Sequence, residues 1–137
     1  MNGHGRLNMT AGLFFMAAFM AYGFFLIYMR DFSATKDAWI AAYAEGDHFQ
    51  SRLAHVHGNL FAFLNVAIGY LLLRFPVSPG MAKTASWAAL AGMLMPLGIL
   101  AETWFGAPPI FVLVGAVSMI VAILTLAFAF ADMKDAA

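Results

Sequence analysis

The sequence predicts an all-α integral membrane protein, built as one domain (residues 1–137) in the form of an up-down bundle of four helices. Of the 137 residues, 64% are hydrophobic and 10% are charged, whereas soluble domains carry about 25% charged residues. Four apolar stretches reach about 20 residues, the length that crosses a bilayer as a helix. These runs lack the strict alternation of barrel strands, so the sequence favours helices.

The four expected spans follow one another along most of the chain. They cover about residues 7–28, 53–73, 85–104 and 110–131. The connections at 74–83 and 105–109 are short and rich in proline and glycine. Short connections join neighbouring antiparallel helices, so the last three spans should pack side by side.

The first connection, about residues 29–52, is longer and more polar than the others. Its segment DAWIAAYAEG (37–46) predicts a short helix at the membrane surface. In such a helix Trp39 and Tyr43 would lie among the lipid headgroups.

The charge of the chain excludes some functions and gives an orientation. The net charge is zero, so the chain lacks the basic footprint of a nucleic-acid-binding protein. The absence of cysteine excludes disulfides, thiolate metal sites and covalent haem attachment. Four basic residues lie on the side of the termini and three on the other side; the four are Arg6, Arg74, Lys83 and Lys134. This small excess favours both termini in the cytoplasm, and we expect a bacterial-type inner (cytoplasmic) membrane.

The start of the second span, SRLAHVHGNLFAFLNV (51–66), holds an unusual set of polar residues. Ionisable groups inside a span are costly and usually mark function. His55 and His57 point about 200° apart on a helix, so they cannot bind one ion from the same helix. We expect at most one of them to face the bundle interior or a cofactor. The alternative is that both are interfacial histidines near the headgroups.

Several neighbours of these histidines have both a structural and a functional interpretation. Asn59 shares a face with His55, and Asn65 lies deeper; asparagines in spans either join helices by hydrogen bonds or line a polar pocket. Gly58 permits the close approach of a flat group or of another helix. Arg52 either extends to the headgroups or holds an acidic cofactor edge such as a propionate.

Glu102 is the one carboxylate near the core of an expected span. It either reaches water at the helix end or acts as a proton carrier or an ion partner for a histidine. The sequence has no Ser/His/Asp set on a helical pattern and no glycine-rich phosphate loop. A histidine just inside an apolar bundle, with glycine and arginine nearby, suits axial ligation of haem.

The segment AHVHGNLFAFLN (54–65), the GHG at 3–5 and the four-span layout resemble the styrene-oxide isomerase family. This resemblance implies a homotrimer that holds haem b at the boundaries between protomers. In the family, the histidine of an AH pair at the start of the second helix binds the iron. Ferric iron then acts as a Lewis acid on the oxygen of a small hydrophobic epoxide. Opening of the C–O bond and a hydride shift give an aldehyde without net redox change.

Carried over by residue, the resemblance makes His55 the axial ligand and matches Gly58 to the AHxxG pattern. The family's active-site asparagine lies six residues after the histidine, where this chain has Phe61, and no tyrosine occurs between residues 83 and 109 to match the family's third-helix tyrosine. Other polar residues would have to replace this pair. The candidates are Asn59, Asn65 and Glu102.

Two other functions stay open beside a haem-dependent isomerase. One is a membrane cytochrome that carries electrons or senses a gas, which would need a second ligand such as His57 from a neighbouring protomer. The other is a cofactor-free accessory subunit of a membrane complex. In that case substitution of either histidine would change packing but no colour.

Overall fold

The computed structural model describes residues 3–133, so Lys134 lies outside the described residues. The described chain forms six α-helices and no strand. They are α1 (Gly3–Asp31), α2 (Lys36–Ala41), α3 (Gly46–Arg74), α4 (Pro79–Gly92), α5 (Leu94–Phe105) and α6 (Ile110–Ala131). The all-α prediction is therefore confirmed.

Four helical segments are long and apolar enough to cross a membrane: α1, α3, α4 with α5, and α6. These segments coincide with the four expected spans, and the chain is a multi-pass membrane protein by that criterion. Many large apolar side chains lie on the outside, including Phe14 and Phe24 at 75% and 73% exposed. Such a surface needs hydrocarbon around it, since soluble proteins rarely expose large contiguous apolar patches.

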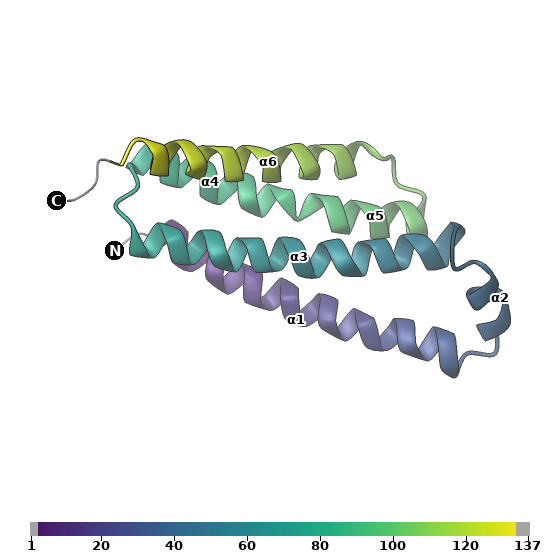
Figure 1. Cartoon of the computed structure of the whole chain (residues 1–137). Helices are drawn as coiled ribbons and strands as arrows, with labels where there is room; N and C mark the ends of the chain where they lie inside the picture. The colour runs from purple at the N-terminus through teal and green to yellow at the C-terminus, as the bar shows by residue number, and fades with distance from the viewer. Residues whose placement is uncertain (1–2, 134–137) are drawn as a thin grey trace.

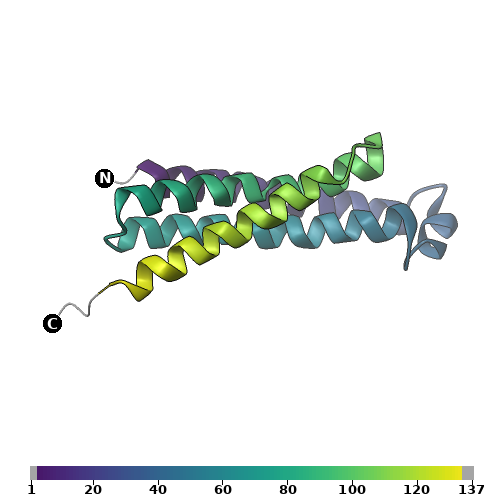
Figure 2. The same cartoon turned by 90° about the horizontal axis from the view of Figure 1, so that it is seen from above.

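The helices lie lengthwise beside one another, with α3 between α1 and the pair formed by α4 and α5 (Figure 1). Helix α6 packs against α4 and α5 and crosses the bundle obliquely (Figure 2). The start of α1 and the end of α6 lie at one end of the bundle, and α2 caps the other (Figure 1). This is the up-down arrangement that the short connections predicted.

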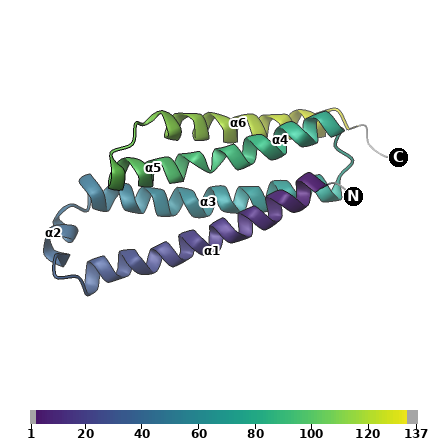
Figure 3. The same ribbon diagram turned by 180° about the vertical axis from the view of Figure 1, so that it is seen from behind.

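Helices α1 and α3 are close together at the start of α1 and diverge toward α2 (Figure 3). Glycines explain the close end. A Cβ on Gly5 would lie 2.7 Å from the Gly69 carbonyl oxygen, and one on Gly12 would lie 2.7 Å from that of Ala62. Small residues let membrane helices approach to backbone contact. The two helices therefore meet at one end and leave room between them at the other.

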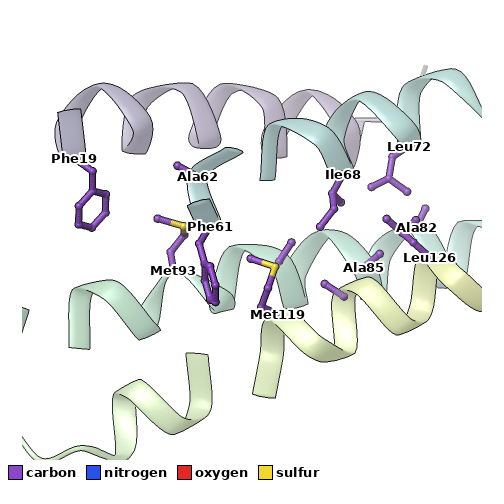
Figure 4. Packing of buried hydrophobic residues seen from close by; sticks show 12 residues of the cluster. Phe19, Phe61, Ala62, Ile68, Leu72, Ala82, Ala85, Met93, Met119 and Leu126 are labelled. Carbon is purple, nitrogen blue, oxygen red and sulfur yellow. The ribbon is translucent and has the colours of Figure 1, made fainter. Parts of the chain in front are cut away.

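The apolar core lies where α3, α4 and α6 meet, and it extends to α1 through Phe19. Figure 4 shows the ring of Phe19 projecting from α1 toward the middle of the bundle, with Phe61, Met93 and Met119 among the other core side chains. Phe19 is 3% exposed and Met119 is 4% exposed. This packing fixes α1 against α3 just below the point where they separate.

The third span is broken at Met93, between α4 and α5. Pro96 causes this break, because it has no N–H to donate to the carbonyl one turn earlier. A helix tolerates proline in its first turn, and α5 begins at Leu94. The second half of the span ends at Gly106, whose φ of 66° is the left-handed conformation common after helices.

The connection between α1 and α3 differs from the expected interfacial helix. Helix α2 is shorter than segment 37–46, and Trp39 is 7% exposed instead of lying among headgroups. The Trp39 indole stacks on the His48 ring at 4.6 Å, and the His48 Nδ1–H donates to the Trp39 carbonyl oxygen at 2.6 Å. Tyr43 keeps 56% of its surface exposed. His48 therefore draws Trp39 inward, and only Tyr43 remains available as a surface anchor.

Candidate functional site

His55 lies on α3 at the height where α1 begins to separate from it, and its side chain is half-buried. Its Nδ1 lies 2.8 Å from the carbonyl oxygen of Phe19 on α1. A carbonyl oxygen only accepts hydrogen bonds, so Nδ1 carries the proton and Nε2 keeps its lone pair. The ring is thus held across the α1–α3 interface with one nitrogen available as a ligand.

Gly23 on α1 provides the space that the His55 ring occupies. A Cβ at this position would lie 2.8 Å from His55 Cε1 and 3.4 Å from Nε2. Gly23 was not among the residues predicted for the site. The one signal was its spacing of four residues from Phe19, which places both on the same face of α1.

A groove of about 690 Å³ opens beside His55 between the diverging helices. Its wall is apolar except for two side chains, those of His55 and Asn59. The lining residues are Met20, Gly23, Phe24, Leu26, Ile27, His55, Val56 and Asn59. We call this cavity the His55 groove.

Asn59 accompanies His55 in this groove, one helical turn further along α3. Its Nδ2 donates to the His55 carbonyl oxygen at 2.9 Å. Of the two asparagines that the sequence offered as replacements for the family's amide, Asn59 is the one beside His55. Phe61, which occupies the family's asparagine position, lines a different cavity.

His57 faces that other cavity. Its Nδ1–H donates to the carbonyl oxygen of Leu53, one turn earlier in the same helix, at 2.9 Å. The ring packs edge-on against Phe61 at 6.3 Å between centroids. The cavity, of about 430 Å³, lies between α3, α5 and α6, and we call it the His57 groove. The two histidines therefore serve different grooves, as their spacing on a helix requires.

Gly58 is buried beneath the ring of Phe19. A Cβ on Gly58 would lie 2.2 Å from the nearest ring carbon. Of the two interpretations of this glycine, the approach of another helix accounts for its contacts. The same contact positions Phe19, whose carbonyl oxygen holds His55, so Gly58 acts on the site through packing.

Asn65 lies in the bundle interior and is 0% exposed. Its Nδ2 donates to the carbonyl oxygens of Phe61 at 3.0 Å and Ala89 at 2.9 Å. Its Oδ1 accepts from Asn8 Nδ2 at 2.8 Å, and Asn8 in turn accepts from the Ser86 hydroxyl. Ten residues of helix separate Asn65 from His55, about 15 Å along the axis. Its donors bond within α3 and to α4, its acceptor bonds to α1, and the structure places it away from the His55 groove.

Glu102 is exposed near the end of α5. Within residues 3–133, no three His, Cys, Asp or Glu side chains come together to hold a metal ion. The structure therefore does not join Glu102 to either histidine in a metal site built from side chains alone.

Arg52 lies at the α2 end of the His55 groove, where a second cavity of about 510 Å³ begins. The two cavities share Leu26 and Ile27 in their linings. The polar part of the second cavity is formed by Arg30, Asp31, Tyr43, His48 and Arg52, and we call it the mouth of the groove.

Comparison of the chain with protein-family models, with curated proteins and with solved structures gives no match. Function must therefore be argued from the site. The His55 groove offers one oriented imidazole nitrogen, an apolar wall that faces the bilayer side of the bundle, and a cationic mouth. This combination suits a large apolar ligand that accepts a nitrogen ligand and has a polar edge.

Proposed function

We propose that the protein is a membrane haem-b protein of the styrene-oxide-isomerase type, in which His55 is the axial ligand of the iron. The observation that carries this proposal is the His55 imidazole, whose Nδ1–H is bonded to Phe19 and whose Nε2 remains available in an apolar groove. Histidines that bind metals almost always donate their other N–H to a carbonyl or carboxylate.

The His55 groove suits a porphyrin in shape and chemistry. Its wall is apolar, it is open along one side, and its volume is about 690 Å³. Gly23 lets the imidazole lie close to the backbone of α1 at the wall of the groove. A flat apolar group can then lie against α1 and α3 with its metal at His55.

The opposed directions of the two histidines favour a single protein ligand on the iron. His57 of the same chain faces the other side of α3 and cannot reach the His55 groove. His55 would therefore be the one histidine of this chain that holds the haem, and the apolar groove beside it would receive a substrate. When bound, ferric haem supplies Lewis-acid chemistry, which turns a small hydrophobic epoxide into an aldehyde.

The residues of this chain orient and protect that chemistry. The Phe19 carbonyl oxygen and Gly23 set the direction of the His55 ring, and Asn59 adds one polar group beside it. The apolar wall excludes water. Because His55 forms part of the wall of the groove, the opposite side of the ligand faces out of this chain. A homotrimer would cover that side with a second copy, and an apolar substrate would arrive through the bilayer.

A membrane cytochrome is the second candidate, and one observation favours it. His57 also lines a groove at the surface of the bundle, and because its Nδ1–H is bonded to Leu53, Nε2 is the nitrogen left for a ligand. A neighbouring copy could present this nitrogen as a second ligand. For both candidates we propose the cytoplasmic membrane with cytoplasmic termini, on the distribution of basic residues.

An absorption spectrum of the detergent-purified protein, oxidised and then reduced with dithionite, tests the proposal. We expect a Soret band that His55→Ala abolishes and His57→Ala retains. Five-coordinate iron would support the isomerase, and six-coordinate iron that becomes five-coordinate in His57→Ala would support the cytochrome. A colourless wild type after growth with ample haem precursor would reject both and leave the accessory-subunit function.

A further inference from the structure

Arg52 is a partly buried residue, and its guanidinium group has no acidic partner among residues 3–133. It lies over the Tyr43 ring at 3.7 Å, and its Nη1 donates to the Tyr43 carbonyl oxygen at 3.1 Å. Arginine carries five N–H donors in a planar fork, so most of them are left without a protein acceptor. Buried charges are normally paired, because an unpaired one loses its hydration without compensation.

Charge at the mouth of the groove is unbalanced in the same direction. Arg30 and Asp31 form a bidentate pair at 2.9 and 2.7 Å, which uses the only carboxylate that lines the mouth. Two arginines and one aspartate leave a net charge of one positive.

The position of Arg52 relates the mouth directly to the ligand site. Arg52 precedes His55 by three residues, about 4.5 Å along the helix axis, and lies on a neighbouring part of the same face. Leu26 and Ile27 line both the mouth and the His55 groove, so the two cavities are neighbours. A ligand at His55 would extend to Arg52 if it is wider than one helical turn.

We infer that the mouth is a carboxylate-binding site, formed by Arg52 with Arg30, for the acidic edge of the apolar ligand that lies in the His55 groove. The inference rests on the proposed function, in which that ligand is haem and the carboxylates are its two propionates. Arginine suits this role because its fork matches a carboxylate with two parallel hydrogen bonds. The site also orients the ligand, with its acidic edge toward α2 and its apolar edge toward the close end of α1 and α3.

Metal-free protoporphyrin IX and its dimethyl ester form the test pair, because esterification removes both negative charges and leaves the apolar ring. Binding is measured by porphyrin fluorescence on the wild-type protein in neutral detergent with phosphatidylcholine. We expect the free acid to bind at least about tenfold more tightly, the value of one charge-assisted hydrogen bond. Arg52→Ala should remove most of this preference, and Arg30→Ala part of it.

Arg74→Ala is the matched control, since it removes the same charge at the opposite end of α3 and should keep the full preference. Equal binding of acid and ester by the wild type would overturn the inference, and so would a preference that both groove variants retain. A preference that disappears when phosphatidylglycerol replaces phosphatidylcholine would show that lipid headgroups hold the arginines, and it too would overturn the inference. Because the pair lacks iron, these outcomes are separate from the Soret band of His55→Ala, which tests the proposed function.

Discussion

His55 and His57 stand two residues apart on α3, and each donates its Nδ1–H to a carbonyl oxygen while its side chain lines a groove. The partners of the two rings differ. His55 is bonded to Phe19 on another helix, whereas His57 is bonded to Leu53 of its own helix. The cavities differ as well, since the His55 groove leads to a cationic mouth and the wall of the His57 groove is otherwise apolar.

This difference indicates which histidine is built to hold a ligand. A hydrogen bond within one helix, such as that of His57, orients the ring relative to its own helix only. It does not depend on how the helices pack. A bond between helices, with Gly23 opposite the ring, requires that α1 and α3 be positioned for it. Tertiary positioning of the second nitrogen is typical of metal-binding histidines, and it assigns the ligand role to His55.

The largest expected effect comes from exchanging the two histidines for alanine in turn. His55→Ala should lower haem content by more than about a hundredfold, beyond the range seen for outer partners of a ligand. His57→Ala should keep it, because its ring lies on the other face of α3. Pyridine haemochrome absorbance per mole of folded protein measures both. Equal losses of haem content in the two variants would contradict the assignment of the ligand role to His55 alone.

Gly23→Ala tests whether the cross-helix position of the His55 ring matters. The new methyl group would lie 2.8 Å from His55 Cε1 and displace the imidazole ring from its position against α1. We expect haem affinity to fall by about tenfold. Gly80→Ala is the control, since a Cβ there meets nothing within 4 Å. Unchanged affinity in Gly23→Ala would mean that the ring is not held by this contact.

Asn65 in the bundle interior and Asn59 at the His55 groove should differ in their effect on stability. Asn65→Ala removes hydrogen bonds to three partners and leaves Asn8 short of an acceptor. We expect a loss of about 1–3 kcal/mol in the free energy of unfolding, which thermal denaturation in detergent measures. The Soret maximum of the folded fraction should not move. Asn59→Ala, at the half-buried position, should leave stability nearly unchanged.

Asn59→Leu should have the smallest effect, and this effect should be confined to haem binding in the His55 groove. The substitution removes the donor to the His55 carbonyl oxygen and the one other polar side chain of the wall. We expect a change of about threefold in haem affinity, the size of a weak neutral hydrogen bond, with unfolding unaffected. Haem transfer to a soluble acceptor protein measures the affinity. A loss as large as that of His55→Ala would make Asn59 part of the ligand set.

Most of the fold could be predicted from the sequence, and less of the site. The four spans follow from hydropathy and length, and the opposite directions of His55 and His57 follow from helix geometry. Asn65 shows the limit of such arguments. Its depth in the span required a hydrogen-bond partner, but two of the partners it has, Asn8 and Ala89, are 57 and 24 residues away in sequence. Nothing local links them to Asn65.

The sequence by itself determined the class of protein, the number of spans and the cluster of polar residues at the start of the second span, because these depend on local composition and helix periodicity. The tertiary structure decided which neighbours each residue has. It placed Phe19 over Gly58, Gly23 against the His55 ring, and Trp39 on His48 instead of at the headgroups. Glycine contacts bring α1 and α3 together at one end and leave them apart at the other. That divergence, which no single helix encodes, creates the groove beside His55 and opens it toward Arg52.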